Sequence, residues 1–142
     1  MFLSMKSLDI FTTIQIFNNI WIIFVFCLYF CMKHIYLINI DNTDFYKIGF
    51  TKQDPKRRLK ALQTGNPIKL VLTDYYTTDL ATEVETAMHN LFKYKKIEEK
   101  LDITLLGEWF VLDEEFVKDF KNTCKTVEEG IRAIKDNSTL FF

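Results

Sequence analysis

Two tyrosines, Tyr36 and Tyr46, stand ten residues apart in the apolar stretch HIYLINIDNTDFYKIGFTK, which covers residues 34–52. Basic residues follow the second tyrosine closely. A phenol can donate and accept hydrogen bonds, and nearby lysine or arginine side chains can neutralise phosphate. The pattern leaves two interpretations open. The tyrosines are aromatic residues that fill a hairpin, or they are the paired phenols of a nuclease site.

Charge is distributed unevenly along the chain, although the net charge is only -1. Between residues 46 and 70, a single acidic residue, Asp54, opposes the basic residues Lys47, Lys52, Lys56, Arg57, Arg58, Lys60 and Lys69. From residue 97 onward, acidic residues outnumber basic ones. The first cluster is compatible with solvated helix faces, but it also indicates a local phosphate-binding surface.

The apolar pattern and the turn residues predict the first elements after residue 33. Residues 34–40 and 45–50 are rich in Ile, Tyr and Phe, and the turn-forming residues 41–44 join them, so we expect a β-hairpin. Asp54 followed by Pro55 is typical of a helix start. A Gly-Asn-Pro break after Thr64 ends that helix near Gln63.

The remaining elements predict an α/β (α+β) domain, a small three-stranded antiparallel sheet flanked by helices. We expect a third strand over residues 70–76, a helix over 79–94 and acidic amphipathic helices over 114–135. The predicted domain organisation has three parts: an apolar N-terminal segment (1–33), the α/β domain (34–123) and an acidic helical tail (124–142).

Helical periodicity sorts the charged residues of the two predicted helices. Arg58 lies beside the apolar stripe formed by Leu59 and Leu62, whereas Arg57 points nearly away from it. In the next helix, Glu85 and His89 are four residues apart and share one flank. A pair at this spacing is compatible with an ordinary surface contact.

Five segments, HIYLI, YKIG, DPKRRLKALQTGNP, EVETAMHNLF and GEWFVLDEEF, follow one another between residues 34 and 120. Together they resemble the GIY-YIG endonuclease superfamily, and in particular its branch in phages and large DNA viruses, known as a DNA-binding domain. Ile35-Tyr36 corresponds to the first half of the family signature, and residues 46–49 to the second. The chain departs from the signature at His34, which replaces a glycine, and at Lys47, which is inserted in the second triplet.

The resemblance implies a GIY-YIG-like fold and a metal-dependent DNA endonuclease that acts in the cytoplasm or nucleus of a host cell. Glu85 then holds a divalent metal, magnesium or manganese, and Arg58 stabilises the charge that builds on the phosphoryl group. Tyr36 takes a proton from water, and Tyr46 orients that water or the phosphate. His89 relays a proton or braces Glu85. The residues expected to bind the DNA backbone are Lys47, Lys52, Lys56, Arg57 and Lys60.

A shared tyrosine site places a condition on the hairpin. Residues that face one another across two strands lie on the same side of the sheet. A connection of two or four residues puts Tyr36 and Tyr46 on opposite faces, whereas three or five residues, or one bulge, puts them together. The nuclease interpretation requires the second arrangement, with Tyr36, Tyr46, Arg58 and Glu85 converging on one concave surface.

The N-terminal segment carries no charge between Asp9 and Lys33. Residues 10–32 approach the length of a membrane-spanning helix, and Lys33 would then favour a cytoplasmic location for the rest of the chain. Alternatively, translation begins at Met32, and the preceding residues are an upstream extension. The three cysteines show no zinc-binding spacing, which indicates a reducing compartment or buried thiols: Cys27, Cys31 and Cys124.

Three functions therefore remain in view. The first is a metal-dependent DNA endonuclease, and the second is a DNA-binding module of the same fold that cleaves nothing. The third is a membrane-anchored adaptor whose globular part recruits a partner. Cleavage in the presence of added metal separates the first from the second, and membrane fractionation separates the third.

Overall fold

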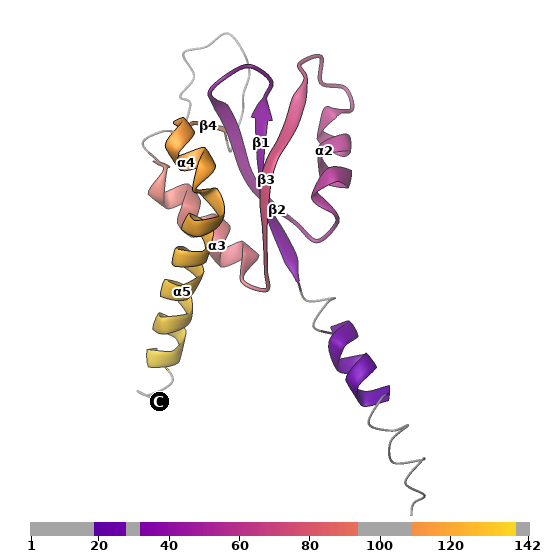
Figure 1. Cartoon of the computed structure of the whole chain (residues 1–142), viewed down its shortest axis with the longest axis vertical. Coiled ribbons are helices and arrows are strands. Elements are labelled where there is room, and N and C mark those ends of the chain that lie inside the picture. The colour runs from indigo at the N-terminus through magenta and orange to yellow at the C-terminus, as the bar shows by residue number, and fades with distance from the viewer. Residues whose placement is uncertain (1–18, 28–31, 94–108, 139–142) are drawn as a thin grey trace, which may run out of the picture. The chain divides into compact units, whose positions relative to one another are not determined.

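The computed structural model describes residues 19–27, 32–93 and 109–138 (Figure 1). The chain divides into two compact units, Met1–Met32 and Lys33–Phe142. In the first unit, residues 19–27 form a helix. No helix among the described residues has the length and apolar character needed to cross a membrane. Because residues 10–18 and 28–31 lie outside the described residues, the expected membrane span stays a prediction.

The second unit has a mixed α/β fold built on an antiparallel sheet, as predicted. Its strands are β1 (Lys33–Ile40), β2 (Phe45–Thr51), β3 (Leu70–Thr78) and β4 (Trp109–Val111), in the spatial order β3-β1-β2-β4. The sheet has four strands rather than the expected three. β4 pairs with β2 over Phe45–Lys47, and three residues are too few to show a strand periodicity in the sequence.

Four helices accompany the sheet: α2 (Pro55–Gln63), α3 (Ala81–Leu91), α4 (Glu114–Lys118) and α5 (Phe120–Ser138). The predicted start of α2 is confirmed, because the Asp54 carboxylate accepts a hydrogen bond from the Lys56 amide at 2.8 Å. The boundary expected after residue 123 falls inside α5, where Cys124 is fully buried in the core. Residue 94, at the expected end of the second helix, lies outside the described residues.

The sheet separates two hydrophobic cores, with α2 on one face and α3 and α5 on the other (Figure 1). The core on the α2 face contains Tyr36, Ile38, Ile40, Leu70 and Trp109, against which α2 packs its leucines. The core on the α3/α5 face includes Ile35, Leu37, Ile48, Met88 and Phe120. Successive residues of a strand point to opposite faces, so each of β1 and β2 contributes to both cores.

Candidate functional site

The hairpin register places the two tyrosines on opposite faces of the sheet. Tyr36 is the cross-strand partner of Gly49, and Tyr46 is the partner of Asn39. Tyr36 belongs to the core on the α2 face, whereas Tyr46 packs against the core on the α3/α5 face. The expected convergence of the two phenols is therefore wrong. The physical reason is the four-residue connection between β1 and β2, with Asn42 in a left-handed conformation at φ 58°, followed by an unbroken pairing register.

Lys47 takes the place on β2 that a second phenol would need. It is the cross-strand partner of Ile38 and therefore points to the same face as Tyr36. Its ammonium group lies 5.9 Å from the centre of the Trp109 ring, which belongs to the same core. The residue inserted into the second triplet thus shifts Tyr46 by one position and reverses the direction of its side chain.

The environment of Tyr46 does not suit it for accepting a proton. Burial, followed by the negative charges of Asp44 and Glu114, raises the pKa of Tyr46 above its ordinary value. A phenol with a raised pKa has a smaller fraction in the phenolate form at neutral pH, so less of it can accept a proton. In this structure Tyr46 is a core residue at the edge of the α3/α5 face.

Tyr36 packs its hydroxyl end directly against the backbone of Gly49. A Cβ atom on Gly49 would lie 2.6 Å from Cζ of Tyr36 and would also clash with Oη. Only glycine therefore allows the phenol to rest over β2 in this position. The side chain as a whole is 2% exposed, so the packing fixes its orientation.

Arg58 of α2 is the second polar group on this face. Its Nε atom is buried and has no hydrogen-bond partner in the described part of the chain. Lys56 and Gln63 face β3 across a groove, and at about 100° per residue Arg58 lies on the opposite flank of α2, toward β1 and β2. Arg57 is exposed, so the predicted division between the two arginines is confirmed.

Glu85 and His89 lie on α3, on the face of the sheet opposite Tyr36 and Arg58 (Figure 1). The expected convergence of Glu85 with Tyr36 and Arg58 on one concave surface is therefore wrong as well, because α3 and α2 cover opposite faces of the sheet. His89 Nε2 is 2.8 Å from the carbonyl oxygen of Ile48 and 3.8 Å from Glu85 Oε1. A carbonyl oxygen can only accept, so Nε2 carries a proton and donates it to this bond. His89 therefore ties α3 to β2 at the residue next to Gly49, which supports the bracing role rather than the proton relay.

The two groups of side chains approach the same strand from its two faces. β4 covers the outer edge of β2 only as far as Lys47, so in the described part of the chain Ile48–Thr51 has no strand partner on that side. Tyr36 rests on Gly49 from the α2 face, and His89 binds the Ile48 carbonyl from the α3 face. We refer to Ile48–Thr51 as the open edge of β2.

The donor set at this edge limits the kind of metal it could hold. The described residues contain no group of three or more His, Cys, Asp or Glu side chains suited to a metal ion. Glu85 is a single carboxylate with a side chain that is 14% exposed, and His89 Nε2 is already bound to Ile48. Magnesium commonly takes only one or two protein carboxylates and fills its remaining positions with water and substrate phosphate. Glu85 fits that mode of binding and does not fit a structural metal centre.

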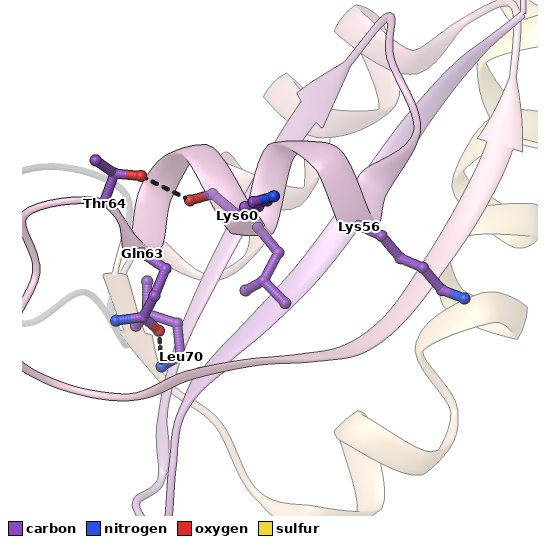
Figure 2. A pocket seen from close by; sticks show the side chains of 6 residues that line it. Lys56, Lys60, Gln63, Thr64 and Leu70 are labelled. Carbon is purple, nitrogen blue, oxygen red and sulfur yellow. Dashed lines mark hydrogen bonds between the residues drawn. The ribbon is translucent and has the colours of Figure 1, made fainter.

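The predicted DNA-binding residues surround α2 rather than forming one patch. Lys56 and Lys60 line a groove of about 350 Å³ together with Leu59, Gln63, Thr64 and Leu70, as Figure 2 shows. The Gln63 amide fixes the far end of this groove, where its oxygen accepts from the Leu70 amide at 2.8 Å. Lys52 is exposed before α2, and Arg57 is exposed on its outer surface. A strand of nucleic acid that contacted all of these residues would have to cross α2.

Residues 33–125 match the T5orf172 domain, and the chain belongs to this domain family. The matched segment contains every candidate site residue described above. No curated protein and no solved structure matches the chain significantly.

Proposed function

We propose that the protein binds DNA and hydrolyses its phosphodiester bonds in a metal-dependent reaction at the open edge of β2. The proposed site uses the single phenol of Tyr36 in place of two converging tyrosines, and Glu85 reaches the edge from the α3 face rather than sharing a surface with Tyr36 and Arg58. The observation that carries this proposal is the Nε of Arg58, which is buried without a hydrogen-bond partner among the described residues, on a helix that has no acidic residue in its first turn. Leaving such a nitrogen without a partner costs roughly 1–3 kcal/mol, which a phosphate oxygen would recover. The association of the T5orf172 domain with GIY-YIG-like nucleases supports the same proposal.

The proposed roles follow from the positions of the side chains. Arg58 binds the phosphoryl oxygens and stabilises the charge that accumulates on them during the reaction. Tyr36 accepts the proton of the attacking water in its phenolate form, and DNA binding must first admit water to this side chain, which is 2% exposed. Lys47, on the same face, adds positive charge nearby. A magnesium or manganese ion held by Glu85 would supply Lewis acidity to the phosphate. His89 keeps Glu85 at β2 by binding the Ile48 carbonyl.

A DNA-binding module without cleavage is the second candidate, and one observation favours it. Tyr46 faces away from Tyr36, so a site that needs two phenols on one surface is not formed. The exposed cations around α2 would still hold phosphates by neutralising their charge. In this alternative, Arg58 anchors a phosphate and no bond is broken.

A plasmid-nicking assay with the full-length chain separates the two candidates. Supercoiled DNA is incubated with protein in magnesium, in manganese and in EDTA, and DNA affinity is measured in EDTA by fluorescence anisotropy. We expect nicking only with metal, and its loss by orders of magnitude in Glu85→Gln. Affinity without metal should stay equal or rise, because a negative charge has been removed near the phosphate.

Glu83→Gln is the matched control on the same helix. Glu83 pairs with Lys135 of α5 at 3.1 Å, away from β2, so this variant should nick DNA like the wild type. Equal nicking by wild type and Glu85→Gln would remove the metal site from the proposal. Binding by the wild type with no nicking in either metal would establish the binding module instead.

A further inference from the structure

Tyr75 on β3 is an exposed aromatic residue next to the candidate site. Among the described residues 33–93 and 109–138, it is the only exposed Phe, Trp or Tyr, at 41%. It is also the direct cross-strand partner of Tyr36 on β1. Opposed residues of an antiparallel pair share a face and have Cβ atoms about 5 Å apart. Tyr75 is therefore the neighbour of Tyr36 on the β3 side, while the Tyr36 hydroxyl lies over Gly49 on the β2 side.

Positively charged and polar groups surround this ring. Lys121 of α5 reaches the β3 edge, where its Nζ lies 5.8 Å from the Tyr75 ring centre and 3.0 Å from the Asp74 carboxylate. The His34 ring meets Tyr75 edge-on at 5.8 Å, with Nδ1 2.9 Å from the Thr77 hydroxyl. Lys121 neutralises the negative charge of Asp74. A phosphate group near Tyr75 is therefore not repelled by this carboxylate.

The packing of α2 leaves Tyr75 exposed on β3, although the neighbouring Tyr36 is covered. The leucines of α2 pack in the core of Ile38, Ile40 and Leu70, which lies toward the β1–β2 turn. α2 itself starts soon after Thr51, the cross-strand partner of His34. Lys56, in the first turn of α2, therefore lies at the same end of the sheet as Tyr75. A chain of phosphates could run from the groove in Figure 2 past Lys56 toward Tyr75.

We propose that Tyr75 is a stacking platform for an unpaired nucleobase, so that the protein prefers single-stranded or branched DNA to continuous duplex. This inference rests on the proposed function, because it places the base beside the bond held at Tyr36 and Arg58. Inside a duplex, a base has both faces stacked and is not free to stack on a side chain. An exposed aromatic ring with adjacent cations is the arrangement that proteins use to bind unpaired strands.

The test compares two substrates by anisotropy with the full-length chain in EDTA, which stops cleavage. One is a labelled single strand, and the other is the duplex of the same sequence. We expect Tyr75→Ala to weaken single-strand binding by about 5- to 150-fold, the range measured for stacked bases, and to change duplex binding by about twofold or less. Tyr75→Phe keeps the ring and should bind like the wild type.

Val111→Ala is the matched control, since Val111 is 44% exposed on β4 at the other edge of the sheet. This variant should leave both affinities unchanged. A second readout is the fluorescence of 2-aminopurine in the single strand, which should be quenched by wild type and Tyr75→Phe but not by Tyr75→Ala. Thermal unfolding of each variant shows whether it is folded.

Unchanged single-strand binding in Tyr75→Ala, or an equal loss on both substrates, would overturn the stacking platform. Tighter wild-type binding to duplex than to single strand would overturn the substrate preference. If single-strand binding depends on Tyr75 but no metal produces cleavage, the platform stands and the nuclease proposal fails. Efficient nicking of duplex DNA that does not depend on Tyr75 would support the nuclease proposal and overturn the stacking platform.

Discussion

The two faces of the sheet differ in the hydrogen bonds and ion pairs that their polar side chains make. On the α3/α5 face, the Tyr76 hydroxyl donates to the Glu128 carboxylate at 2.6 Å, and Arg132 binds both Glu128 and Asp79. These residues connect β3 and the start of α3 to α5 through bonds within the protein. The network satisfies its own charges, so its role is to hold α5 on the sheet.

On the α2 face, Arg58 differs from the residues of this network. Arg58 Nε is buried without a hydrogen-bond partner in the described part of the chain, and Lys56 and Lys60 line an open groove. A buried donor without a partner destabilises the fold unless something outside the chain binds it. The α3/α5 network thus has its partners within the protein, whereas the buried Nε of Arg58 has none in the described part of the chain, and we propose that Arg58 binds DNA for this reason.

Among substitutions of the basic residues, the largest effect should come from Arg58→Lys. We expect the rate of metal-dependent nicking to fall by about 10²–10³, because an ammonium group cannot reproduce the guanidinium contacts to a phosphoryl group. Arg57→Lys is the adjacent control, and it should change the rate only a few-fold because Arg57 is exposed on the outer surface of α2. Similar losses in both variants would show that α2 contributes charge and no specific contact.

An intermediate effect is expected for the lysines of the groove. Lys56→Ala and Lys60→Ala should each reduce the slope of log affinity against log salt by about 1, as expected when one phosphate contact is lost. Lys118→Ala on α4 removes a cation that pairs with Glu114 at 3.5 Å and should leave the slope unchanged. The measurement is anisotropy between 50 and 200 mM salt, roughly the range over which backbone contacts are most visible. An unchanged slope in all three variants would show that the DNA backbone does not contact Lys56 or Lys60.

The smallest effect concerns stability and belongs to the α3/α5 face. Burial opposes the ionisation of Glu128, but hydrogen bonds from Tyr76 and Arg132 outweigh it and lower the pKa of the carboxyl from 4.5. A lowered folded-state pKa gives stability that is present above the ordinary carboxyl pKa and is lost as the pH falls through the folded value. We expect Glu128→Gln to cost about 1 kcal/mol at pH 7 and to flatten the loss of stability below pH 4.5.

Urea unfolding at pH 7 and at lower pH measures this effect, with nicking as the second readout. Nicking by folded Glu128→Gln should equal that of the wild type, because the network joins β3 and the start of α3 to α5 and contains no residue that we assign to the reaction. The hydrogen bond between Tyr76 and Glu128 also predicts that the free energy of unfolding falls at high pH. Burial and the Glu128 carboxylate raise the pKa of Tyr76 from 10.0 to about 12, so the stabilisation declines as the pH rises through this range.

Local patterns in the sequence predicted most of the fold. The hairpin, the Asp54 cap of α2 and the opposite exposure of Arg57 and Arg58 all follow from residues close together in the chain. The Tyr76–Glu128 bond joins residues 52 positions apart, and no local pattern indicates it. The predicted four-residue turn over residues 41–44 is the one observed, and by the parity rule it puts Tyr36 and Tyr46 on opposite faces. The expected convergence came from the nuclease interpretation, not from the turn. The burial of Arg58 Nε likewise depends on how α2 packs on the sheet, which no local sequence pattern indicates.

The most direct test of the account is to compare Tyr36→Phe and Tyr46→Phe in the magnesium-dependent nicking assay. Each variant removes one hydroxyl, and Gly49 is unchanged, so the ring of Tyr36 keeps its place on β2. We expect Tyr36→Phe to lose about 10²–10⁴ in rate and Tyr46→Phe to nick like the wild type. Loss of nicking in Tyr46→Phe with full activity in Tyr36→Phe would contradict the assignment of the reaction to the α2 face.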